Sequence, residues 1–79
     1  MKMTVERYDK IFGEWVLRDS ATKQITEQRY ELMFSPIVKD YMERIYTGTE
    51  TTVETEAIKQ TIATSKDLEF REIRTFYKI

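Results

Sequence analysis

Aromatic and basic side chains alternate in the last fourteen residues of this 79-residue chain, which read KDLEFREIRTFYKI. The aromatic residues there are Phe70, Phe76 and Tyr77, and the basic residues among them are Arg71, Arg74 and Lys78. Aromatic rings stack on the bases of a single nucleic-acid strand while basic side chains contact its phosphates. The same pattern is typical of a core strand with solvated flanking charges. The chemistry that these residues suggest is binding.

Side chains suited to catalysis are scarce. The chain has no histidine and no cysteine, and its two glycines, Gly13 and Gly48, cannot form a phosphate-binding loop. The densest carboxylates are Glu50, Glu54 and Glu56, which lie in a polar, threonine-rich segment where solvated acids do little catalysis. We therefore expect no catalytic residues and no enzyme.

Cofactor and metal sites are not expected either. Zinc sites are built mainly from cysteine and histidine, and the acidic residues lack the Asp-x-Asp spacing of a calcium loop. Thirteen basic and fourteen acidic residues give a net charge of -1, which provides no overall attraction to nucleic acid or to an anionic membrane. No stretch of 18 apolar residues or signal-like start is present, so we expect a soluble cytoplasmic protein without a membrane span.

The length of the chain predicts a single compact domain, residues 1–79. So small a domain buries a modest core and has no disulfide to reinforce it. Five tyrosines, four phenylalanines, one tryptophan and four methionines are more than such a core needs, and these residue types are enriched at interfaces. We therefore expect a homodimer.

The clearest element is a helix over residues 35–48, with Ser35 as N-cap, Pro36 in the first turn and Gly48 as a left-handed C-cap. Its apolar stripe, which we expect to face the core, consists of Ile37, Val38, Tyr41, Met42, Ile45 and Tyr46.

Residues 13–34 predict two strands around a polar turn at residues 19–24, the second strand carrying alternating Tyr30, Leu32 and Phe34. Residues 1–12 also fit a helical stripe, but a three-stranded N-terminal meander is favoured. Thr51 and Glu54 match a capping box and favour a helix over residues 53–65, with a strand as the alternative.

The C-terminal segment predicts a core strand with a bulge near Arg71 and Glu72. The bulge places five residues on one face: Leu68, Phe70, Ile73, Thr75 and Tyr77. The predicted fold class is thus α+β, in the order βββααβ, with an antiparallel sheet of three N-terminal strands and one C-terminal strand packed against two helices.

The function that fits these observations is a small non-enzymatic protein-interaction module: an inhibitor, adaptor or regulator, of a size and composition that suit a phage or mobile-element protein. The alternative is a single-stranded nucleic-acid-binding protein that uses the C-terminal strand. A shared exposed face for Arg71, Arg74 and an aromatic residue favours nucleic acid; burial of Phe70, Ile73 and Tyr77 favours a core strand. The candidate partner-binding residues are Trp15, Arg71, Arg74, Phe76, Tyr77 and Lys78.

Overall fold

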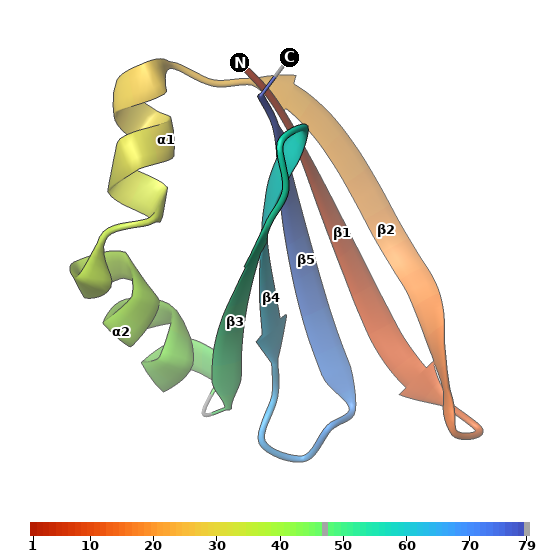
Figure 1. The fold of residues 1–79 in the computed structure, drawn as a ribbon. Helices are drawn as coiled ribbons and strands as arrows, with labels where there is room; N and C mark the ends of the chain where they lie inside the picture. Colours follow the sequence, from red (N-terminus) through yellow and green to blue (C-terminus); the bar gives the residue numbers. More distant parts are fainter. Residues whose placement is uncertain (47, 79) are drawn as a thin grey trace.

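The computed structural model describes residues 1–46 and 48–78, without the side chains of residues 42–46. Within these residues the elements follow the order ββααβββ (Figure 1). The predicted order βββααβ is therefore wrong. The elements are β1 (Lys2–Ile11), β2 (Glu14–Gln24), α1 (Glu27–Met33), α2 (Pro36–Tyr46), β3 (Thr49–Glu54), β4 (Ile58–Thr64) and β5 (Phe70–Tyr77).

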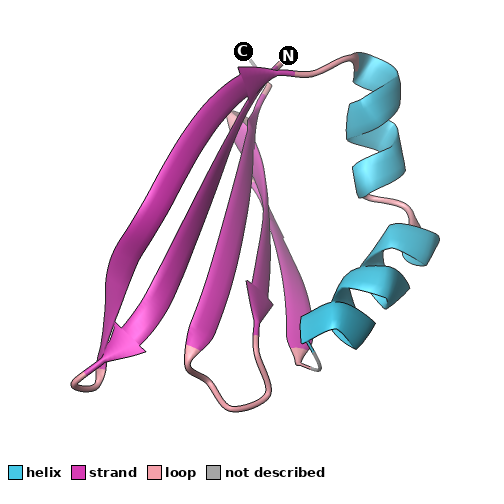
Figure 2. Cartoon of the chain, turned by 180° about the vertical axis from the view of Figure 1, so that it is seen from behind, coloured by secondary structure: helices cyan, strands magenta, loops and turns pink. Residues whose placement is uncertain are grey.

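The strands form one antiparallel sheet with the order β2-β1-β5-β4-β3. The C-terminal strand β5 thus lies between β1 and β4, and the two ends of the described chain lie at the same end of the sheet (Figure 1). Both helices lie on one side of the sheet (Figures 1 and 2). We call that side the helix face and the opposite side the open face.

The segment predicted as the third strand is the helix α1. Thr26 caps this helix by accepting a hydrogen bond from the backbone N–H of Arg29 at 3.2 Å. Tyr30, Met33 and Phe34 have the i, i+3, i+4 spacing of a helix face, and the rings of Tyr30 and Phe34 lie 5.1 Å apart. The period-two interpretation failed because Leu32, its middle residue, is exposed.

Residues 53–65 are not a helix, because they contribute to the strands β3 and β4, as the alternative interpretation had it. The capping box of Thr51 and Glu54 does not start a helix. Instead, Thr55 turns the chain: its hydroxyl accepts hydrogen bonds from the N–H groups of Ala57 at 3.3 Å and Ile58 at 3.2 Å. The β-branched threonines and isoleucines on either side favour strands.

The first 24 residues form a hairpin of two long strands, so residues 1–12 are a strand, as favoured, and not a helix, but the three-stranded meander is wrong. The turn lies at Phe12 and Gly13, whose φ angles are 51° and 80°. Residues 19–24, predicted as a turn, belong to β2, because each of them pairs with a residue of β1. A register shift opposite Arg7 and Tyr8 bulges β2.

The helix α2 is confirmed, and Ser35 caps it by accepting a hydrogen bond from the N–H of Val38 at 3.3 Å. The predicted apolar stripe is wrong for Ile37 and Tyr41, which are exposed, and the side chains of Met42, Ile45 and Tyr46 lie outside the described part. The predicted C-cap adjoins residue 47, which is also outside it. Gly48 is needed for close approach, since a Cβ there would lie 1.8 Å from the Thr64 carbonyl oxygen.

The core lies on the helix face and is small. Phe76 of β5 is completely buried, and its ring meets those of Tyr30 at 5.4 Å and Phe34 at 4.8 Å in edge-on contacts. Met3, its partner on β1, is buried beside it, and Ala63 is buried further along the sheet, opposite Glu72. The three aromatic rings therefore join the helix layer to the centre of the sheet.

Candidate functional site

The register of β5 against both neighbours is continuous from end to end, so the predicted bulge does not form. Side chains therefore alternate strictly between the two faces. Because Phe76 faces the helices, Phe70, Glu72 and Arg74 face the same side, while Arg71, Ile73 and Tyr77 lie on the open face. The alternation divides the six candidate residues: Trp15, Arg71 and Tyr77 lie on the open face, and Arg74, Phe76 and Lys78 lie on the helix side.

Arg74 takes part in a buried ion cluster on the helix face. Its guanidinium lies 3.5 Å from the carboxylate of Glu72, and Arg7 lies 3.7 Å from the other oxygen of the same carboxylate. Glu72 is only 4% exposed. A buried carboxylate is tolerated when cations surround it, so Arg74 is explained as the counterion of Glu72.

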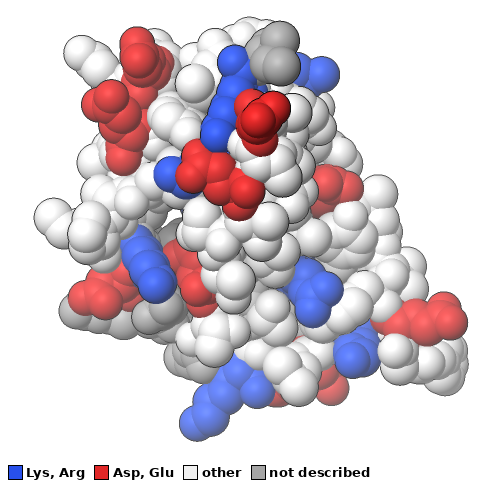
Figure 3. All heavy atoms as spheres, viewed as in Figure 1, with Lys and Arg blue, Asp and Glu red and all other residues white. Residues whose placement is uncertain are grey.

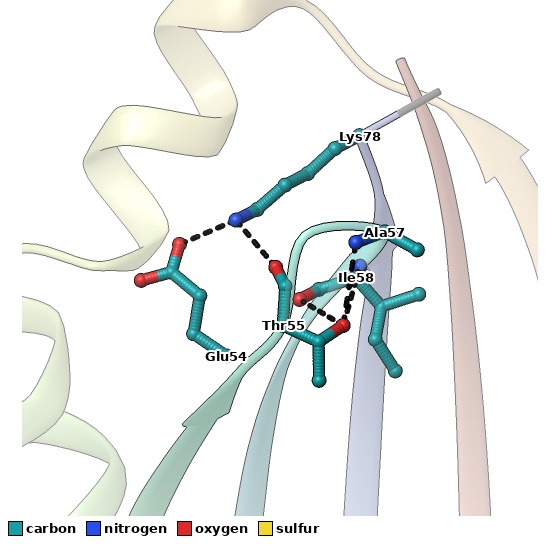
Figure 4. A network of polar contacts seen from close by, with 5 residues as sticks. All are labelled: Glu54, Thr55, Ala57, Ile58 and Lys78. Atoms are coloured by element: carbon teal, nitrogen blue, oxygen red, sulfur yellow. Dashed lines mark hydrogen bonds and ion pairs between the residues drawn. The ribbon is translucent and has the colours of Figure 1, made fainter.

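Lys78 is also engaged within the chain (Figure 4). Its ammonium lies 2.8 Å from a carboxylate oxygen of Glu54 and donates a hydrogen bond of 2.8 Å to the carbonyl oxygen of Thr55. Its backbone N–H donates to the carbonyl oxygen of Ala57 at 2.9 Å. The Lys78 ammonium holds the pKa of the Glu54 carboxyl below its usual value. Lys78 thus fastens the β3–β4 turn to the end of β5.

The helix face carries many charges although the helices lie over it. By register, its charged strand residues are Arg7, Asp9, Glu14, Asp19, Lys23, Glu50, Glu54, Lys59, Glu72 and Arg74. Several of these charges are matched by contacts within the chain. Lys59 lies 3.9 Å from the centroid of the Phe34 ring, for instance, and Arg7 lies 3.6 Å from Asp19.

The open face is poor in charge although no helix covers it. Its charged strand residues are Lys2, Glu6, Lys10 and Arg71. The other positions are apolar, aromatic or hydroxyl-bearing. By register they include Thr4, Tyr8, Trp15, Leu17, Thr22, Thr51, Val53, Ile58, Gln60, Ile62, Thr64, Ile73, Thr75 and Tyr77.

Polar groups on the open face bond to one another. Gln60 donates a hydrogen bond of 3.0 Å to the hydroxyl of Thr75, and the hydroxyls of Thr4 and Thr22 lie 3.3 Å apart. The Tyr8 hydroxyl donates to the Glu6 carboxylate at 2.7 Å. This hydrogen bond, together with burial, raises the pKa of Tyr8. With these groups partnered, the face can be covered by another surface without leaving them unsatisfied.

Cations lie over aromatic rings at two places on the open face. The guanidinium carbon of Arg71 is 4.2 Å from the centroid of the Trp15 ring, and the Lys10 ammonium is 5.2 Å from it. Near the chain termini, the Lys2 ammonium is 4.9 Å from the Tyr77 ring. The Nε atom of Arg71 is buried and has no hydrogen-bond partner among the described residues. These groups can bind and stack.

A second surface lies at the end of the sheet opposite the chain termini (Figure 1). It is formed by the β1–β2 turn and the β4–β5 loop, which are linked by a 2.8 Å hydrogen bond from Lys10 N–H to the Glu69 carbonyl oxygen. Five large apolar side chains are exposed there. We call them the apolar tip: Ile11, Phe12, Val16, Leu17 and Leu68.

The sequence interpretation placed a turn close to Gly13 but considered only Trp15 beside it as a binding residue, so it missed the apolar tip. The signal was present: a Phe-Gly pair follows a long run of strand-forming residues, and glycine favours tight hairpin turns. Metal chemistry finds no support, since the described residues contain no cluster of three or more side chains able to hold a metal ion.

In comparisons with known proteins, no family model matches the chain, and no curated protein and no solved structure is significantly similar to it. Among the helices that the structure describes, none has the length and apolar character needed to cross a bilayer. The open face and the apolar tip are therefore the features that bear on function.

Proposed function

We propose that the protein is a small non-enzymatic protein-interaction module of the cytoplasm, and that it buries its open face against another protein, in the first place a second copy of itself. One observation carries this proposal: the uncovered face of the sheet has fewer charged strand residues than the covered face. The centres of protein interfaces are depleted in charge and enriched in aromatic residues. A face exposed to water throughout its working life needs neither property.

A homodimer fits the shape of this face. Two sheets pack face to face about 10 Å apart with their strands inclined by about 30°. Ile62 and Ile73 are direct partners on β4 and β5, near the middle of the face, and would form the centre of such a contact. Charges of both signs, from Lys2, Glu6 and Lys10, lie on the flanking strand β1.

Trp15, the one tryptophan, lies on this face and reports its occupation. On dilution from about 100 μM to 1 μM, a range that spans ordinary dimer affinities, we expect the Trp15 emission to shift to longer wavelength as the face is exposed to water. Ile73→Lys should show the shifted emission at every concentration. The matched control is Leu32→Lys, on the exposed side of α1, which should behave like wild type. Emission independent of concentration and identical in all three proteins argues against the proposal.

Single-stranded nucleic acid is the second candidate, and one observation favours it. Trp15 and Tyr77 share the uncovered face with Lys2, Lys10 and Arg71, and stacking rings beside basic groups are what a single strand requires. Arg74 is not part of this nucleic-acid site, because it lies on the helix face. Glu6, on the same face, and the net charge of -1 disfavour binding to phosphates.

An oligothymidylate titration separates the two candidates. If the second is right, Trp15 fluorescence is quenched, the affinity falls steeply with salt, and Arg71→Ala weakens binding. Arg74→Ala is the matched control for loss of one arginine, and it should leave oligonucleotide affinity unchanged. If the first candidate is right, the oligonucleotide leaves the emission of Trp15 unaltered.

A further inference from the structure

We infer that Phe12, at the apolar tip, is an anchor residue that inserts into an apolar pocket of a target protein other than a second copy of this chain. The inference rests on the proposed protein-binding function and assigns the target contact to the tip, apart from the open face. The backbone conformation of Phe12 and the exposure of its ring both cost stability.

Phe12 is an unfavourable choice for its turn. Phe12 and Gly13 have φ angles of 51° and 80°, the combination found in two-residue type I′ hairpin turns. Such turns favour Asn-Gly, because asparagine enters the left-handed region readily and a bulky residue does not. A Phe in the first of these positions strains the backbone at the centre of the longest hairpin in the described structure.

Packing does not offset this strain. The Phe12 side chain is 102% exposed, so its ring lies in water. A Cβ added at Gly13 would also meet no atom within 4 Å, which confirms that the turn projects into open space. Phe12 therefore contributes nothing to the folded chain, and strained residues of this kind cluster at binding sites.

Leu68, in the neighbouring β4–β5 loop, also combines a positive φ angle with an exposed apolar side chain. Its φ angle is 60°, and its side chain is 58% exposed. Phe12 and Leu68 are the two non-glycine residues with positive φ in the part of the chain that the structure describes, and both are large, apolar and exposed. Ile11, Val16 and Leu17 extend this surface along the hairpin. Both loops lie at the same end of the sheet (Figure 1).

The charges around the tip point to a protein as the partner. Lys10 and Glu14 flank the turn, and Asp9 lies 3.9 Å from Arg18 in an ion pair. The tip therefore has no excess of positive charge to attract a nucleic acid or an anionic bilayer. Acidic and basic side chains are likewise interspersed on the side of the molecule drawn in Figure 3.

Two hollows beside α1 on a second copy do not suit the ring. Both have apolar walls at Met3 and Met33, but one is rimmed by charged residues that include Arg7, Asp19 and Glu72, and the other by Lys23 and Arg29. A projecting ring instead fits a dry pocket on a different protein, where a single buried aromatic anchor often dominates the affinity. The partner's chemistry is thus a concave apolar pocket about one ring wide, with a rim of mixed charge.

The test uses Phe12→Asn, which gives the turn its preferred residue while removing the ring. Leu32→Asn removes an equally apolar, exposed side chain from α1 and is the matched control. Tagged wild type, both variants and the tag alone are incubated with nuclease-treated cell extract. The protein that wild type enriches is purified, and its affinity for each variant is measured by calorimetry. We expect Phe12→Asn to lose at least about 30-fold in affinity, and Leu32→Asn to stay within about twofold. We also expect Phe12→Asn to unfold at the same or a higher temperature than wild type.

The inference is overturned if the purified target binds Phe12→Asn as tightly as wild type, or if no enrichment depends on Phe12. In the first case, if Ile73→Lys no longer binds the target, the proposed protein-binding function stands, with the open face as its site. If both variants bind the target as tightly as wild type, both proposals are wrong. Phe12-dependent binding to phosphatidylcholine/phosphatidylglycerol vesicles or to an oligonucleotide duplex, without a protein target, also overturns it, because the tip then acts as a membrane or nucleic-acid wedge.

Discussion

The two faces of the sheet differ in a way that their covering does not explain. The helix face holds Phe76 and its two aromatic neighbours, but around them it carries ion pairs such as Glu72 with Arg7 and Arg74. The open face carries isoleucines, threonines and aromatic rings, and few charges. A sheet that worked as an isolated monomer is expected to place its charges on the uncovered side.

This difference shows that solvent exposure in a single chain is an incomplete guide to which surface is functional. Glu72 is buried against Arg7 and Arg74 at an acceptable cost, while Arg7, Asp19 and Glu54 on the same side are about half exposed. The open face has its polar groups bonded internally, for example Gln60 to Thr75 and Tyr8 to Glu6, and is left with apolar contact area. It resembles one half of a core, and in our proposal the other half comes from a partner.

The largest expected effect comes from neighbouring residues of β5 that lie on opposite faces. Phe76→Ala removes a completely buried ring and its contacts with Tyr30 and Phe34, and should cost about 3–5 kcal/mol. That is a large share of the roughly 4–12 kcal/mol available to a domain of this size. Tyr77→Ala should cost the monomer about 1 kcal/mol or less. Urea unfolding at micromolar concentration compares the two; equal losses would erase the distinction between the faces.

Removing a carboxylate should also cost more stability on the helix face than on the open face. Glu72→Gln removes the buried carboxylate that lies against Arg74 and Arg7, and should destabilise the fold by about 1–3 kcal/mol. Glu6→Gln on the open face keeps a hydrogen-bond acceptor for Tyr8 and should cost about 0.5 kcal/mol or less. Thermal unfolding of both variants provides the comparison. A larger loss for Glu6→Gln would mean that the ion cluster is not what stabilises the helix face.

The cation over Trp15 should matter little for folding. Arg71→Met keeps much of the side-chain volume but removes the guanidinium stacked on the ring, at an expected cost of about 0.5–1 kcal/mol in the monomer. The Trp15 emission should shift at the same time, because the charge beside the indole is lost. A loss as large as that of Phe76→Ala would assign the open face a structural core of its own.

The smallest effect expected is a pH dependence at the β3–β4 turn. Lys78 lowers the folded-state pKa of Glu54, so the ionised carboxylate is favoured in the native state. Its contribution is present above the usual glutamate pKa of about 4.3 and is lost as the pH falls through the lowered folded value. Lys78→Met removes that contribution. The stability curves of wild type and Lys78→Met should therefore differ slightly at neutral pH and converge in acid; a difference that grows in acid contradicts the assignment.

Local signals in the sequence predicted some elements and not others. Ser35 and Pro36 mark the start of α2 with side-chain and backbone chemistry that acts within one turn, and that helix was predicted correctly. Tyr30 and Phe34 fit the period of a strand and that of a helix, and the cap at Thr26 and the contact with Phe76 decide for a helix. Residues 19–24 look like a turn but pair with β1 along its whole first half, which local propensity cannot show.

The candidate site was predicted in part. Trp15, Arg71 and Tyr77 were named from their residue types, and they do share one face. Arg74, Phe76 and Lys78 were named from the same pattern, but the unbroken register of β5 turns them to the other side. The absence of the predicted bulge places Phe70 on the opposite face from Ile73 and Tyr77, because a shift of one residue reverses the side chains on one side of it. Phe12 was missed because its role depends on where the hairpin turns.

The most direct test of the central claim, that the open face is covered by a second copy, is sedimentation equilibrium of wild type and Ile73→Lys at about 1–100 μM, where ordinary homodimers form. We predict that wild type approaches twice its chain mass of 9.5 kDa as the concentration rises, while Ile73→Lys stays at the chain mass with its fold intact by circular dichroism. A wild-type protein that remains at 9.5 kDa across this range, or an Ile73→Lys variant that still doubles its mass, would contradict it.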